Sequence, residues 1–155
     1  FEHKAVYISR DWFPDFANYR RDGYDFDARY DEGLAKHTDK ALYDLLDSHA
    51  PVISKELKQL GDYRKGGNKG FDTSITRLQE QCYVITSNFI YMTDKHGQHY
   101  GWGVAEYSTP EKFMGAAFTD KVYQREPEES YQLIFEHLRK VLPHASDEQI
   151  KKILK

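Results

Sequence analysis

Ten polar side chains in the middle of the chain are of types that bind phosphate groups and base edges. Lysine and arginine contact phosphate oxygens, whereas hydroxyl and guanidinium groups also reach base edges in the major groove. The pattern therefore predicts nucleic-acid contacts from three neighbouring segments. The ten residues are Arg64, Lys65 and Lys69 in a glycine-rich stretch, Thr73, Ser74, Thr76 and Arg77 in the segment that follows, and Lys95, His96 and His99 in a later turn.

The segment that carries Thr73 and Arg77 reads as a helix followed by a β-hairpin. Its apolar residues recur at helical spacing and leave the polar residues on the opposite face. Two runs of β-branched and aromatic residues come next, VITSNFIYM and YGWGVAEY, with a polar turn between them. We expect a helix over 69–83 and strands over 84–92 and 100–107. The apolar stripe consists of Phe71, Ile75, Leu78 and Cys82.

Two further helices precede this segment. Leucines at helical spacing predict a helix over 39–48 with Thr38 as its cap, and a short one over 53–60 with Ser54 as its cap. Three helices followed by a hairpin are the arrangement of a winged helix, whose third helix enters the major groove and whose hairpin is the wing. We therefore expect an α+β fold with a winged-helix domain over 38–107.

The segments on either side are expected to pack against this domain as one compact unit. Residues 1–37 predict an aromatic and acidic N-terminal arm, the least regular part of the chain, with a possible short strand over 5–8. Residues 108–155 predict two or three bracing helices, with start signals at Pro110, Pro127 and Ser146. The arm residues that we expect to pack inward are Trp12, Phe13, Phe16 and Tyr19.

The charge balance only locally favours a nucleic-acid partner. The 155 residues carry a formal net charge of -3. Residues 55–77 contain six Lys or Arg and three acidic residues, whereas residues 10–32 contain four Arg and seven acidic residues. Any attraction for phosphate therefore belongs to the middle of the chain. The competing interpretation of the helix over 69–83 is that it is exposed to solvent and carries ordinary polar residues that bind no nucleic acid.

Neither a metal nor a cofactor is expected. His96 and His99 form a His-x-x-His turn that lacks a third firm ligand. The acidic run of the arm lacks the glycine and glutamate placement of a calcium loop, so solvated charges are the better interpretation. No phosphate-binding or dinucleotide-binding glycine motif is present. The acidic run comprises Asp22, Asp25, Asp27 and Asp31.

The lone cysteine indicates a cellular compartment. Cys82 falls on the apolar stripe and has no second cysteine to pair with, which favours a reducing compartment, the cytoplasm. No apolar run approaches the length of a membrane span, so no membrane partner is expected. The chain begins with Phe1 rather than Met, and we expect it to be part of a longer protein.

Two stretches, GFDTSITRLQEQCYVI and YGWGVAEYSTPE, resemble winged-helix proteins related to the AlkZ/YcaQ DNA glycosylases. Together with WFPDFANYRRDGYDFDARYDEG they most resemble the AlkZ-related group of bacterial proteins, over most of the chain. The likeness to the glycosylases themselves covers residues 38–107. It implies a winged-helix fold and a role in DNA binding or repair. The glycosylases use a Gln-x-Gln or Gln-x-Asp motif, which Gln79 and Gln81 match outside its catalytic context.

Three functions follow from these observations. The first is a module that binds double-stranded DNA. The second is a protein-interaction or dimerisation domain whose aromatic N-terminal arm meets a partner protein or a second copy. The third is a glycosylase-like enzyme with Gln79 and Gln81 as its candidate catalytic residues. A flipped base needs an enclosing pocket, so we expect a binding protein rather than an enzyme.

Overall fold

The computed structural model describes residues 5–154 and divides them between two compact units. Unit 2 is the continuous stretch Phe26–Gly115. Unit 1 combines the residues up to Asp25 with those from Ala116 onward. None of the helices in the described part of the chain is long and apolar enough to cross a bilayer.

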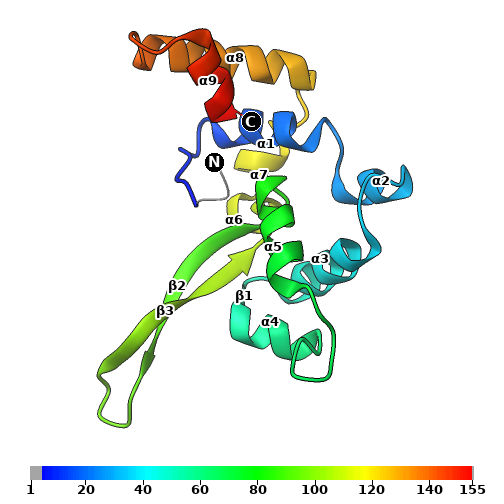
Figure 1. Cartoon of the computed structure of the whole chain (residues 1–155), viewed down its shortest axis with the longest axis vertical. Helices are drawn as coiled ribbons and strands as arrows, with labels where there is room; N and C mark the ends of the chain where they lie inside the picture. Colours follow the sequence, from blue (N-terminus) through cyan, green and yellow to red (C-terminus); the bar gives the residue numbers. More distant parts are fainter. Residues whose placement is uncertain (1–4, 155) are drawn as a thin grey trace. The chain divides into compact units, whose positions relative to one another are not determined.

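Unit 2 is an α+β structure of helices and a three-stranded antiparallel sheet (Figure 1). The strands follow the order β1-β3-β2, and β2 and β3 form the expected hairpin. The short β1 pairs with the end of β3, with Val52 opposite Tyr107. The elements are α2 (Phe26–Asp31), α3 (His37–His49), β1 (Val52–Ile53), α4 (Ser54–Leu60), α5 (Phe71–Glu80), β2 (Ile85–Thr93), β3 (His99–Ser108) and α6 (Pro110–Met114).

The core of unit 2 forms around α5. The whole predicted stripe of Phe71, Ile75, Leu78 and Cys82 is buried. Leu42 and Leu46 of α3 and Leu57 of α4 belong to the same core. The helix itself is shorter than the expected 69–83. It begins after Gly70 and ends before Cys82, and both residues adopt left-handed backbone conformations with φ of 87° and 62°.

Unit 1 is helical, and α1 (Phe13–Arg21) packs along α8. Trp12, Phe16 and Tyr19 pack against the apolar residues of α8 and α9. The Asn18 side chain donates to Ser130 Oγ over 3.0 Å, and Ser130 Oγ donates to Asp15 over 2.8 Å. The remaining helices are α7 (Ala116–Thr119), α8 (Pro127–Val141) and α9 (Asp147–Leu154).

The N-terminal arm is more regular than its composition suggests. We expected an irregular segment, but the structure forms α1 and α2 there. Trp12, Phe16 and Tyr19 have the i, i+4, i+7 spacing of a helix face, and Pro14 stands in the first turn, where no amide donor is needed. The expected strand over residues 5–8 is wrong, because these residues form no strand.

Candidate nucleic-acid interface

The α4–α5 loop holds its three cations on a folded backbone. The Asn68 amide donates to the Asp62 carbonyl over 2.8 Å, and the Asn68 side chain donates to the Gly61 carbonyl over 2.9 Å. A Cβ at Gly67 would lie 2.1 Å from the Asp62 carbonyl oxygen, so this close approach requires glycine. These contacts bring the end of the loop back to its start at Gly61 and Asp62.

The cations of this loop face solvent. Arg64, Lys65 and Lys69 are all exposed. Within residues 5–154 no carboxylate lies within salt-bridge distance of them. Nearby Lys58 is different, because its ammonium pairs with Asp72 over 3.0 Å. The loop therefore presents three positive charges that no acidic neighbour neutralises, which suits a phosphate backbone.

Of the four residues predicted on the outer face of α5, only two are exposed on that face. Thr73 and Thr76 are exposed. Ser74 is buried, and Arg77 points toward α3, where it meets Asp39. The helical pattern identified all four residues as polar. It did not reveal that Ser74 and Arg77 contact another side chain within the fold.

Asp39 near the start of α3 joins these two residues in a buried polar cluster. Arg77 donates through Nε to Asp39 Oδ2 over 2.5 Å and through Nη2 to Oδ1 over 2.8 Å. Only 3% of the Asp39 side chain and 27% of the Arg77 side chain are exposed. This two-point contact fixes the orientation of a guanidinium relative to a carboxylate. The cluster therefore sets how α5 sits against α3.

The cluster also changes how Asp39 titrates. Burial opposes the charged carboxylate and is the largest single influence on its pKa, which it raises. The hydrogen bonds from Arg77 and Ser74, with the charges of Arg77 and Lys36, together outweigh it and lower the pKa of Asp39 below its ordinary value of 3.8. Asp39 accordingly stays ionised in the folded state.

This shift predicts an acid-dependent loss of stability. Because the folded pKa is lowered, Asp39 stabilises the fold fully above its unfolded pKa, and this contribution disappears as the pH falls through 3.8 toward the folded pKa. The difference in free energy of unfolding between wild type and Asp39→Asn should be constant near neutrality and shrink below about pH 4. Urea titrations of both proteins between neutral and acid pH measure it, and a difference independent of pH would contradict the assignment.

The hairpin turn carries the third group of candidates. Asp94 closes the turn, because its carboxylate accepts hydrogen bonds from the amides of His96 and Gln98 over 2.8 and 3.0 Å. Lys95, His96 and His99 are exposed around it. The only acidic side chain of the turn thus points its Oδ1 at the backbone, whereas Lys95, His96 and His99 are exposed.

The candidate catalytic glutamines lie at the end of α5. Gln79 donates through Nε2 to Thr86 Oγ1 over 3.1 Å, and Gln81 is the C-cap residue that follows the helix. Both side chains are partly exposed. Gln79 therefore links α5 to β2.

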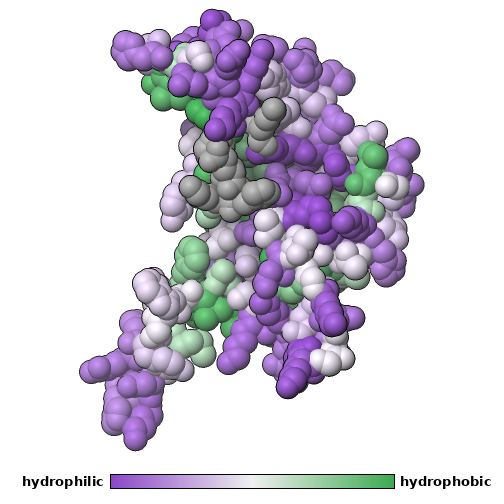
Figure 2. Space-filling view, in the orientation of Figure 1, coloured by the Kyte–Doolittle hydropathy of each residue, from purple (hydrophilic) through white to green (hydrophobic). Residues whose placement is uncertain are grey.

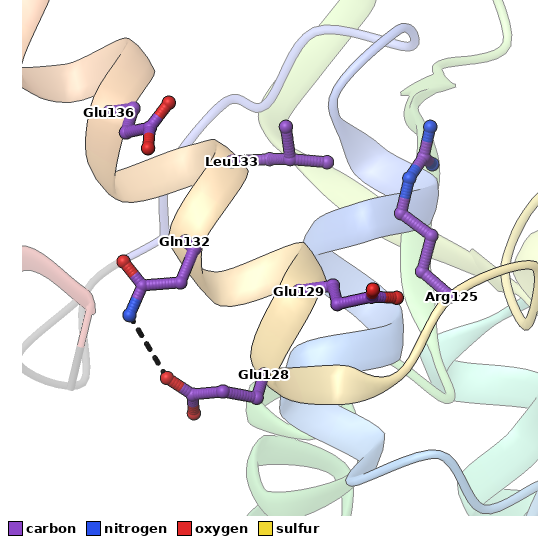
Figure 3. Close-up of a pocket in the computed structure, with 6 residues that line it drawn as sticks. All are labelled: Arg125, Glu128, Glu129, Gln132, Leu133 and Glu136. Carbon is purple, nitrogen blue, oxygen red and sulfur yellow. Dashed lines mark hydrogen bonds between the residues drawn. The ribbon is translucent and has the colours of Figure 1, made fainter.

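A hollow on α8 of unit 1 has the wrong charge for phosphate. Figure 3 shows its side chains spread over one side of the helix and the loop before it. Three carboxylates, of Glu128, Glu129 and Glu136, accompany one guanidinium, of Arg125. In the described residues, no group of three or more His, Cys, Asp or Glu side chains is placed to hold a metal ion.

Two sets of residues could not be singled out from the sequence pattern. The first is Asp39, whose role depends on a partner 38 positions away. The second is a group of exposed aromatic side chains on the hairpin, Phe89, Tyr91, Tyr100 and Trp102. The available sequence signal was a pair of aromatic residues spaced two apart in each expected strand, at 89 and 91 and at 100 and 102.

Comparison with known protein families identifies the family of this chain. A family model described as "AlkZ related" matches residues 1–155, the whole chain. No curated protein and no solved structure matches. The match confirms the resemblance carried by the helix and hairpin sequences and by the N-terminal stretch. The chain therefore belongs to the AlkZ-related family.

Proposed function

We propose that unit 2 is a winged-helix module that binds double-stranded DNA. The observation that carries the proposal is the order of its elements. Helix α3, strand β1, helices α4 and α5 and the β2–β3 hairpin follow one another, and β1 pairs with β3 in the sheet. In winged helices of this order the helix before the hairpin enters the major groove and the hairpin contacts an adjacent part of the duplex.

The cations support the same orientation. Arg64, Lys65 and Lys69 precede α5, and Lys95 lies at the tip of the hairpin. In Figure 1 the α4–α5 loop and the hairpin tip extend toward the same end of unit 2. DNA laid against this end meets positive charge on both sides of α5, with Thr73 and Thr76 between.

Family membership supports DNA as the partner, because AlkZ proteins are related to DNA glycosylases. Enzymatic excision receives less support, since Gln79 is hydrogen-bonded to Thr86 at the surface. A protein partner at the N-terminal arm also receives less support. Trp12, Phe16 and Tyr19 pack against α8 and α9 within unit 1 and stabilise that unit instead of forming a free surface.

Lys65→Ala/Lys69→Ala should weaken duplex binding and reduce its salt dependence. Each phosphate contact contributes about -0.9 to the slope of log K against log salt, so the double variant should flatten the slope by about 2. Fluorescence anisotropy of a labelled duplex across a salt series measures both quantities. Both side chains are exposed, so the fold should be retained.

The matched control removes a lysine from unit 1. Lys151→Ala on α9 takes away an exposed positive charge outside the proposed interface and should leave the slope unchanged. Lys151→Ala removes one charge where the double variant removes two, so a change half as large in this control would mean that only overall charge matters. Absence of duplex binding by wild type at low salt would refute the proposal.

A further inference from the structure

The β2–β3 hairpin exposes more aromatic surface than its fold requires. Phe89, Tyr91 and Tyr100 are 52%, 54% and 56% exposed, and Trp102 is 94% exposed. Figure 1 shows the hairpin extending away from the helices of its unit. The indole of Trp102 thus has almost no intramolecular contact, and the core of unit 2 does not account for it.

The backbone of the hairpin places these rings on two opposite faces. A Cβ at Gly103 would lie 3.1 Å from Phe89 Cβ and 3.1 Å from Tyr91 Cζ, so position 103 points to the face that holds these two rings. Trp102, one residue earlier, points to the other face. A side chain at position 103 would crowd the Tyr91 ring. The hairpin therefore has rings on both sides.

An irregularity in the pairing sets the position of Trp102. Ile90 pairs with Val104 and Met92 with Tyr100, so β3 has two more residues than β2 between these pairs. Gly101 lies within this bulge at φ 72°, a left-handed conformation that favours glycine. Trp102, which is 94% exposed, lies within the same bulge.

Charge argues for nucleic acid at these rings. Beyond them lie Lys95, His96 and His99, and the His99 ring contacts Tyr91 edge-on at a centroid distance of 5.9 Å. The Asp94 carboxylate accepts a hydrogen bond from the His96 amide in the turn. Glu106, at the other end of β3, accepts one from Ser87. Figure 2 shows a hydrophilic hairpin end with less polar residues behind it. Rings beside a lysine and two imidazole groups suit bases and their phosphates.

Size argues against a second protein chain on this surface. Four partly exposed aromatic side chains offer roughly 500 Å² of surface. That surface is divided between two faces, so neither reaches the ~800 Å² per partner that stable protein interfaces bury. A base needs only one ring face, and stacking tolerates any base.

We propose that the hairpin binds DNA containing unpaired bases, which stack on Trp102 and on the Phe89 and Tyr91 face. This inference rests on the proposed DNA-binding function and specifies its substrate as DNA that is locally opened, such as a bubble or a junction between single and double strands. The cations of the α4–α5 loop hold the flanking duplex, and the hairpin engages the opened bases.

The test compares a fully paired labelled duplex with the same duplex carrying a central bubble. Wild type should bind the bubble DNA more tightly. Trp102→Ala should lose on the order of 5- to 100-fold in affinity for it, the range that one base–aromatic stack supplies. Trp102→Phe should recover part of the loss, because it restores a ring. Phe113→Ala is the control, since Phe113 is a half-exposed aromatic residue outside the hairpin.

A second readout is independent of affinity. Stacking of a base on Trp102 should quench tryptophan fluorescence when bubble DNA is added, and Trp102→Ala should abolish the quenching while Trp12 still emits. Equal affinity for paired and bubble DNA would overturn this inference but leave duplex binding intact. No binding to either DNA would overturn both. Self-association that disappears in Trp102→Ala, without any change toward DNA, would overturn it in favour of a protein interface.

Discussion

Asp39→Ala should lower the free energy of unfolding by about 3 kcal/mol, because breaking a buried ion pair from one side leaves the other charge without a partner. The Arg77 guanidinium would lose both of its hydrogen bonds to the carboxylate, and the buried Ser74 hydroxyl would lose an acceptor. We place the loss at the lower end of the usual range because 27% of the Arg77 side chain reaches solvent. Urea denaturation at neutral pH measures it.

Asp44→Ala is the matched control on the same helix. Asp44 pairs with Lys40 over 2.6 Å, but its side chain is 53% exposed. Such a surface pair should contribute no more than about 0.5 kcal/mol. Equal losses in the two variants would show that the buried pair stabilises the fold no more than the surface pair does.

The cluster changes how a DNA-binding defect in Arg77→Ala must be interpreted. Arg77 is a candidate DNA contact by its position on α5, yet both of its described hydrogen bonds go to Asp39. Asp39→Ala frees the guanidinium, whereas Arg77→Ala removes it. Both variants disturb the packing of α5 against α3. If Arg77 acts through the fold, both variants should weaken binding together. If it touches DNA, only Arg77→Ala should do so beyond its effect on stability.

The elements with strong local signals were predictable. The apolar stripe of α5 is buried as expected, because apolar residues that recur with the helical period all lie on the same face of the helix. Pro127 begins α8. Ser146 and Gln149 form the expected reciprocal capping contacts before α9, over 3.3 and 2.8 Å. Each of these features is decided within a few residues of the chain.

Cap positions before α3 and α4 were predicted less well. Thr38 and Ser54 were expected as caps, but α3 begins at His37 after Lys36, and α4 begins at Ser54 after Ile53. Neither helix start has a side-chain cap. A threonine or serine within the first turn is compatible with both positions, so residue type alone does not fix the boundary.

The polar residues of α5 show why the site was only partly predictable. Thr73, Ser74, Thr76 and Arg77 all read as an outer face, because periodicity ranks side chains by polarity. The structure buries Ser74 and turns Arg77 toward a carboxylate from α3. A buried polar side chain is recognised only through its partner, and here the partner lies 38 residues earlier in the chain.

Tyr83→Ala should destabilise unit 2 by about 3–5 kcal/mol, the usual cost of deleting a buried aromatic ring. Tyr83 is 1% exposed and joins a cluster that the sequence did not reveal. Its ring lies 4.8 Å from that of Phe26 on α2 and 6.2 Å from that of Tyr43 on α3. Phe26 and Tyr43 are themselves 4.4 Å apart. The cluster therefore ties the short helix α2 to the core beneath α5.

Tyr83→Phe separates the ring from the hydroxyl. It keeps every ring contact and should cost no more than about 1.5 kcal/mol, the net value of one hydrogen bond. Thermal or urea unfolding of both variants measures the difference. Equal destabilisation by Phe and Ala would mean that the hydroxyl, not the ring, holds α2 in place. With the ring deleted, α2 should also lose amide-exchange protection before α5 does, because α2 has only six residues and depends on Phe26 for its buried contact.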